Sequence, residues 1–138
     1  MTVEHPRHVV VAACLVRDGA GRVLLIRHHR RGWEMPQGRV EEGEGLLEAL
    51  QREVHEETGV VISPGPLAAV WSRTSPPAAL IMGFLGSYRE GELQPSDETP
   101  EVAWFLPAQA LEQVGHPVMR ERLATLMAYD GTTAFITA

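Results

Sequence analysis

The sequence has one cysteine, few aromatic residues, no long apolar run and no excess of basic residues. A single cysteine, Cys14, excludes an internal disulfide and fits a reducing compartment. The longest apolar runs, 9–16 and 78–85, are too short to span a bilayer, and polar residues at 4–7 interrupt any secretory signal. Acidic residues outnumber basic ones by 18 to 12, the wrong sign for gripping long nucleic acids through their phosphates. These absences favour a cytoplasmic protein that acts on a small molecule, without membrane or long nucleic acid as partner.

The chain has 138 residues, of which 44% are apolar and 22% charged, as in an ordinary globular domain with a proper core. We find no internal repeat, no low-complexity segment and no linker that would divide it. Residues 1–138 are therefore predicted to form a single domain.

Hydrophobic spacing and turn residues predict an α/β protein. Strands are expected at 9–16, 23–26, 60–62, 67–71, 79–88, 101–106 and 132–136. Turns are expected at 17–21 and at the proline-containing segment 63–66, and a loop is expected over 28–42. Helices are expected at 44–58, 107–113 and 118–129, the first of them ending at Gly59, a residue suited to a left-handed C-terminal cap.

Three carboxylates of the first helix stand close together. Glu53, Glu56 and Glu57 lie at i, i+3 and i+4, where like charges repel. Helical spacing also puts Glu57 at the margin of an apolar stripe, with Glu53 nearby. That stripe is expected to consist of Leu46, Leu47, Leu50 and Val54. A carboxylate beside a buried stripe is costly unless it is paired or bound to a metal, and a hard divalent cation is the simplest compensation.

Glutamates at this spacing are also common on solvated helix faces, so the three residues alone leave that alternative open. The wider pattern favours the metal site. A solvated acidic helix would need neither Gly38 before it nor Gly59 after it, nor Arg52 beside Glu53.

The whole run from 38 to 60 resembles the Nudix box, G-x5-E-x7-R-E-U-x-E-E-x-G-U, in which U is an aliphatic residue. All nine fixed positions are met, by Gly38, Glu44, Arg52, Glu53, Val54, Glu56, Glu57, Gly59 and Val60. The resemblance implies an α/β/α sandwich with a mixed sheet. It also implies a hydrolase that cleaves a phosphoanhydride bond of a small nucleotide with Mg²⁺ or Mn²⁺, and relatives of this kind are often homodimers.

By this resemblance, Glu56 and Glu57 are the expected metal ligands, and Glu53 is a ligand or the general base. The carbonyl of Gly38 is a further candidate ligand. Arg52 is expected to orient a carboxylate through paired hydrogen bonds. Glu44 is expected to support the site. Alternatively, its negative charge is simply stabilised by the helix dipole at the start of the helix.

Candidates outside the box come from two loops. The acidic loop 97–101 is similar to the family's loop ahead of an aromatic strand, and it offers Glu98 or Glu101 as a further ligand or base. A basic stretch over 27–31 precedes an aromatic residue, so Arg27, Arg31 and Trp33 are predicted to contact the substrate. The alternative is a solvated loop and a tryptophan that belongs to the core.

The predicted activity is that of a pyrophosphohydrolase acting on a nucleoside triphosphate or a related nucleotide. The segment Pro36-Gln37-Gly38 is similar to that of Nudix enzymes acting on capped or dinucleotide polyphosphates, which makes a dinucleoside polyphosphate hydrolase an alternative. A non-catalytic nucleotide sensor is a second alternative, which loss of a box glutamate would favour. A Nudix-like isomerase would want an active-site cysteine, and Cys14 lies in a predicted strand.

Overall fold

The computed structural model describes residues 4–137 and places one mixed sheet at the centre of the molecule. The elements in chain order are β1 Val9–Arg17, β2 Val23–His28, β3 Gly32–Glu34, β4 Gln37–Arg39, α1 Leu46–Thr58, β5 Val61–Arg73, β6 Ala79–Glu90, β7 Glu101–Phe105, α2 Pro107–Gln113, α3 Pro117–Met127 and β8 Ala134–Thr137. The sheet runs β3-β2-β1-β6-β5-β8, with β4 also paired to β1 and β7 to β2. The pairs β1–β6 and β5–β8 are parallel.

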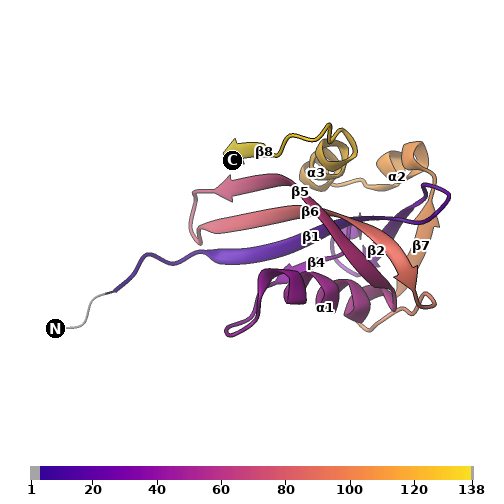
Figure 1. Cartoon of the computed structure of the whole chain (residues 1–138), viewed down its shortest axis with the longest axis horizontal. Helices are drawn as coiled ribbons and strands as arrows, with labels where there is room; N and C mark the ends of the chain where they lie inside the picture. The colour runs from indigo at the N-terminus through magenta and orange to yellow at the C-terminus, as the bar shows by residue number, and fades with distance from the viewer. Residues whose placement is uncertain (1–3, 138) are drawn as a thin grey trace.

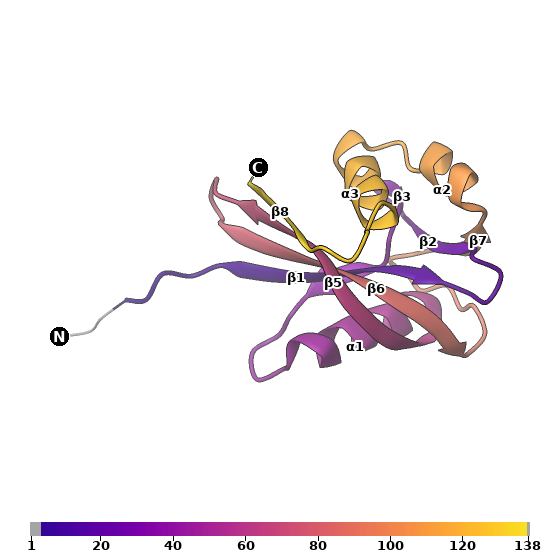
Figure 2. The same ribbon diagram turned by 45° about the horizontal axis from the view of Figure 1, so that its top comes forward.

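Helices cover both faces of this sheet. Helix α1 lies on one side, and α2 and α3 lie on the other (Figures 1 and 2). The predicted α/β/α sandwich with a mixed sheet is confirmed. None of the helices in residues 4–137 has the length and apolar character needed to cross a bilayer.

Strand β1 contributes to both layers of the core. Ala13 and Leu15 pack in the cluster beneath α2 and α3, while Cys14 and Val16 pack in the cluster beneath α1. Successive side chains of a strand point to opposite faces, so a strand with helices on both sides must be apolar throughout. This explains the uninterrupted apolar run at the start of the sequence.

Helix α1 is anchored by Leu50 and Val54, which are almost completely buried. The predicted stripe is wrong at Leu47, which is 48% exposed, because Ala49 faces the sheet instead. The helix begins at Leu46, so Glu44 lies outside it rather than in its first turn. The prediction for its end is confirmed, since Gly59 has φ 82° and donates its N–H to the carbonyl of His55 at 2.9 Å.

Two predicted loop segments contain strand structure. The expected turn at 63–66 lies inside β5, which continues through its prolines because the pairing with β6 shifts register there. The expected loop 28–42 contains β3 and β4. Strand β4 pairs with β1, with Gly38 opposite Ala12, and this pairing sets Gly38 beside helix α1.

Candidate active site

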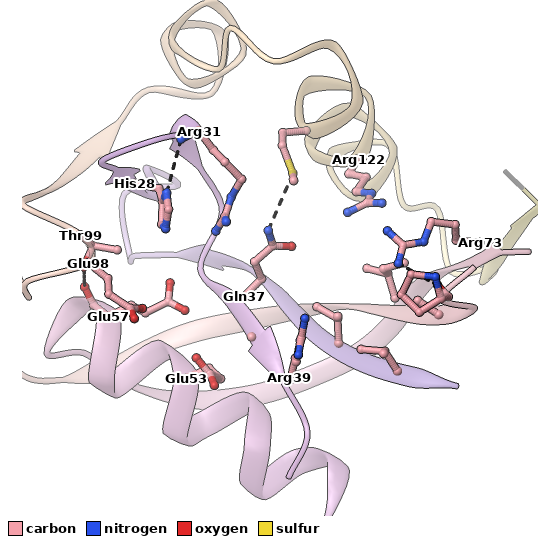
Figure 3. A pocket seen from close by; sticks show the side chains of 17 residues that line it. His28, Arg31, Gln37, Arg39, Glu53, Glu57, Arg73, Glu98, Thr99 and Arg122 are labelled. Atoms are coloured by element: carbon pink, nitrogen blue, oxygen red, sulfur yellow. Dashed lines mark hydrogen bonds between the residues drawn. The ribbon is translucent and has the colours of Figure 1, made fainter. Parts of the chain in front are cut away.

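A cleft of about 600 Å³ opens where α1, β4, α3, the β5–β6 hairpin and the loop before β7 meet. Figure 3 shows two ends with different chemistry. Glu53, Glu57 and Glu98 line one part of the cleft, which we call the glutamate end. The opposite part is lined by Arg73 and Arg122. A cleft of this size accommodates a nucleotide.

The glutamate end depends on close packing between β4 and α1. A Cβ atom placed on Gly38 would overlap the carboxyl group of Glu53. A larger residue at position 38 would therefore displace the Glu53 carboxyl group, whereas the backbone conformation itself does not demand glycine, since its φ is not in the left-handed region. The backbone of β4 thus forms one wall of the carboxylate site.

Glu57 lies in the same corner and is poorly compensated. Its burial, followed by the hydrogen bond and charge of the neighbouring Glu53, holds the pKa of Glu57 well above its usual range. Crowding two carboxyl groups in a partly buried corner disfavours charging both of them. A cation at this position would remove that cost.

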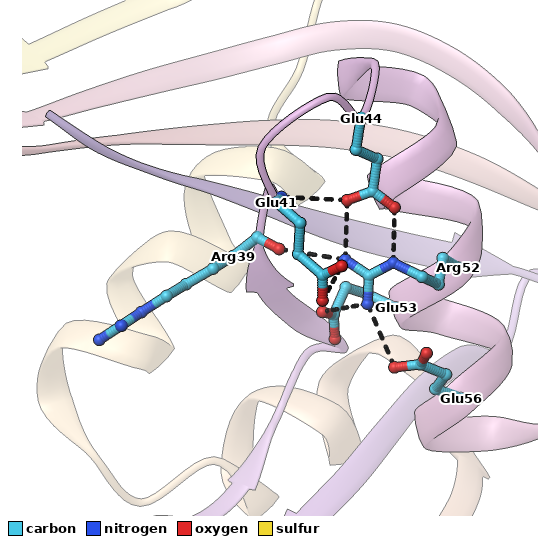
Figure 4. Close-up of polar contacts among 6 residues, drawn as sticks. All are labelled: Arg39, Glu41, Glu44, Arg52, Glu53 and Glu56. Atoms are coloured by element: carbon cyan, nitrogen blue, oxygen red, sulfur yellow. Dashed lines mark hydrogen bonds and ion pairs between the residues drawn. The ribbon is translucent and has the colours of Figure 1, made fainter.

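Arg52 links Glu44, which precedes the helix, to Glu53 and Glu56 within it (Figure 4). Its Nε and Nη2 donate to the two carboxylate oxygens of Glu44 at 2.6 and 2.9 Å. Its Nη1 donates to Glu53 at 2.8 Å and to Glu56 at 3.2 Å, and Nη2 also reaches the carbonyl of Arg39 at 3.1 Å. These paired bonds lower the pKa of Glu44 to about 2. The contact expected of Arg52 is present, and Glu44 acts as its anchor.

The acidic side chains of the site do not converge on a single point. Among residues 4–137, no three His, Cys, Asp or Glu side chains converge as they would around a metal. Glu56 is largely exposed and turns to Arg52. Of the ligands predicted within the box, Glu53 and Glu57 line the cleft with Gly38, and Glu56 does not.

The loop before β7 is tied to the end of α1. Thr99 is 1% exposed, and its hydroxyl donates to the carbonyl of Glu57 at 3.0 Å. This bond fixes the loop so that Glu98 lines the cleft. Its alternative, Glu101, lies elsewhere, in an ion pair with Arg27.

The predicted substrate contacts separate into two groups. Arg31 lines the cleft, but Arg27 and Trp33 do not. Trp33 packs edge-on against Phe105 and lines a different groove, on the side of β7. The structure thus brings only Arg31 of the three to the glutamates.

Arg31 is held by a residue that sequence reasoning missed. Its Nη2 donates to Glu34 Oε1 at 2.7 Å, and its Nε lies 3.0 Å from Oε2. Glu34 is completely buried, so this ion pair compensates a carboxylate that would otherwise be costly. The sequence signal was a glutamate between Trp33 and Met35, in a segment that was read as loop.

Comparison with known proteins agrees with this geometry. The NUDIX domain family matches residues 6–126, which is most of the chain. The chain belongs to the NUDIX family. The family predicted from the box is therefore confirmed.

Two curated relatives illustrate the likeness. The human 8-oxo-dGDP phosphatase NUDT18 is 37% identical over 106 residues, which cover 71% of this chain and 32% of that protein. The RNA pyrophosphohydrolase of Caulobacter vibrioides is 44% identical over 62 residues, or 42% of this chain and 36% of that protein. The matches thus span about a third of the length of these relatives.

The fold is shared with solved Nudix structures. A NUDIX hydrolase from Nitrosomonas europaea superposes with a TM-score of 0.80 at 23% identity, covering 99% of this chain and 83% of that one. At this identity the likeness concerns the fold alone.

Three arginines of this Nudix domain were not predicted as site residues. Arg39 reaches the cleft from β4, Arg73 from the end of β5 and Arg122 from α3. No local motif surrounds Arg73 or Arg122 in the sequence. Their proximity follows from the packing of α3 over the sheet, which the spacing of residues does not reveal.

Proposed function

We propose that this Nudix domain is a Mg²⁺- or Mn²⁺-dependent pyrophosphohydrolase. It cleaves a phosphoanhydride bond of a nucleoside diphosphate linked to another group. One observation carries the proposal: the complete Nudix box folds so that Glu53 and Glu57 face a nucleotide-sized cleft against Gly38.

The residues present fit a divalent cation. Glu53, Glu57 and the carbonyl of Gly38 would hold it, all through the oxygen atoms that Mg²⁺ prefers, and Glu56 would join them only by turning away from Arg52. The raised pKa of Glu57 supports this, because an uncompensated carboxyl pair gains from a positive charge. When bound, such an ion neutralises phosphate charge and makes an attacking water more acidic.

The chain's own residues supply positioning and proton transfer. Arg52 holds Glu53 and Glu56 in place from behind the helix. Arg31, braced by Glu34, presents a guanidinium to a phosphate in the cleft. Either Glu53 or Glu98 accepts the proton of the attacking water, since both line the cleft.

The substrate class is a small nucleotide, such as a nucleoside triphosphate. The names of the two relatives point to an oxidised nucleoside diphosphate and to an RNA pyrophosphate, which share phosphoanhydride chemistry. A dinucleoside polyphosphate is the alternative substrate, because Gln37, the residue whose resemblance suggests it, lines the cleft. The isomerase reading loses support, because Cys14 is fully buried in the core. Cytoplasmic location and a homodimer stay predictions.

The test is a product assay with Mg²⁺ supplied. The panel comprises nucleoside triphosphates, oxidised nucleotides, nucleotide sugars and dinucleoside polyphosphates, with products identified by mass spectrometry. We expect at least one member to yield two phosphate-bearing products. No turnover of any member by the folded protein would favour the nucleotide-sensor alternative.

A further inference from the structure

The end of the cleft opposite the glutamates gathers positive charge. We call Arg73 and Arg122 the arginine end. They come from β5 and α3, and Figure 3 shows them side by side, away from Glu57 and Glu98, with Arg39 of β4 lining the cleft between Glu53 and this end. This concentration contrasts with the chain as a whole, whose net charge is −6.

The arginine end has no acidic partner within the described part of the chain. Neither of its two side chains takes part in an ion pair among residues 4–137. Arg73 donates to the carbonyl of Pro77 at 2.8 Å, which orients its guanidinium without neutralising it. Arginines placed this way attract an anion into the cleft.

Arg122 is the least satisfied member. Its guanidinium lies over the ring of Trp71, 5.7 Å from the centroid, and its buried Nε finds no acceptor among residues 4–137. Burial and then the charge of Arg73 lower the pKa of Arg122. The two guanidinium groups therefore repel each other, and a bound anion would reduce this repulsion. Buried polar groups without partners are rare in native folds, and here the missing partner is an acceptor.

We propose that the arginine end binds a second phosphate group of the substrate, one that is not attacked. This rests on the proposed function, which places the scissile diphosphate at the glutamate end. Arginine pairs bind phosphate through planar, two-pronged hydrogen bonds. Apolar side chains of Val9, Val11 and Ile81 line the same cleft and suit a sugar or base. The preferred substrate therefore carries a phosphate on its far half.

Such a phosphate can come from a phosphorylated sugar or from a longer phosphate chain, and matched substrates separate the two. Coenzyme A and its 3′-dephospho form differ by one sugar phosphate. Adenosine tetraphosphate and ATP differ by one chain phosphate. We expect wild-type protein to prefer the phosphorylated member of one pair, which identifies the source.

The variants Arg73→Gln and Arg122→Gln test the assignment. Each should lower kcat/KM for the preferred member by about 10- to 100-fold, the usual effect of losing a hydrogen bond to a charged group, and should barely affect its partner. Arg89→Gln is the matched control, because it removes one positive charge at an exposed residue outside the cleft. Melting temperatures check folding, and Arg122→Lys keeps the charge while losing the planar fork.

Binding without metal gives a readout that does not depend on turnover. Pyrophosphate titrated in the presence of EDTA should raise the melting temperature of the wild type and shift the Arg122 Nε–H resonance, and the rise in melting temperature should vanish in Arg122→Gln. If no substrate were turned over, this titration would still decide the inference while the proposed function failed.

Three results would overturn the inference. The first is pyrophosphate binding unchanged in Arg122→Gln. The second is equal kcat/KM for both members of each pair in the wild type. The third is a change in the preference between guanine and adenine nucleotides without a change within the pairs, which would show that the arginines read the base.

Discussion

At the glutamate end of the cleft, acidic residues are held in place within one stretch of chain, because Arg52 donates to Glu44, Glu53 and Glu56. At the arginine end, Arg73 and Arg122 come from distant segments and pair with no acid among residues 4–137. We propose that a cation completes the first arrangement and that an anion from outside completes the second.

This difference indicates that the glutamate end serves the reaction and the arginine end serves the choice of substrate. A contiguous motif fixes the spacing of the groups proposed for the reaction, so that spacing survives changes elsewhere in the chain. An assembled set of arginines depends on how α3 packs over the sheet, and it can vary without disturbing the motif. Substitutions at the glutamate end should therefore affect all substrates alike, whereas substitutions at the arginine end should change the preference among them.

The largest effect is expected for Glu57→Gln. Loss of this carboxylate should lower kcat/KM by about 10²- to 10³-fold for every substrate, since it removes electrostatic stabilisation of the reacting phosphate. In EDTA the melting temperature should stay the same or rise, because the repulsion with Glu53 is relieved. Glu48→Gln, at an exposed position of the same helix, is the control. Wild-type turnover by Glu57→Gln would remove Glu57 from the proposed ligands.

Gly38→Ala should come next. The added methyl overlaps the carboxyl group of Glu53, and a displacement of about 1 Å in a reacting group costs roughly 10²-fold in rate. Its melting temperature should also fall. Gly19→Ala, where a Cβ meets nothing within 4 Å, should change neither quantity. Kinetics and thermal melts measure both, and a fully active Gly38→Ala variant would show that the Glu53 carboxyl group need not lie against position 38.

The smallest effect concerns metal binding alone. Mg²⁺ at about 100 times its Kd should stabilise the wild type by about 2.7 kcal/mol, a shift of several degrees in melting temperature. Glu57→Gln should lose this shift and Arg122→Gln should keep it. An equal loss in both variants would show that the two ends act as one site, and the comparison above would fail.

The local features of the fold were predictable from the sequence. Helix α1, its Gly59 cap and the partly buried position of Glu57 follow from spacing within one segment. Errors arose where tertiary packing decides. Leu47 faces solvent because α1 packs on the sheet with Ala49 in the contact. Strand β5 continues through Pro64 because its pairing with β6 shifts register there.

The candidate site was predictable to the same extent. Glu53, Glu57 and Gly38 share the cleft because the box is contiguous. Arg73 and Arg122 were missed because only the packing of α3 beside the β5–β6 hairpin makes them neighbours. Trp33 and Arg27 were placed near the substrate on the strength of sequence proximity, but β2 and β3 direct them towards β7.

The burial of β1 between two helical layers makes its thiol a reporter of unfolding. Cys14 is fully buried, and burial raises the pKa of its thiol, so the native protein should resist alkylating reagents. Because Cys14 packs in the cluster beneath α1, reaching this sulfur requires α1 to separate from the sheet. The alkylation rate of Cys14 therefore measures opening of the α1 layer, even in variants that have lost all turnover.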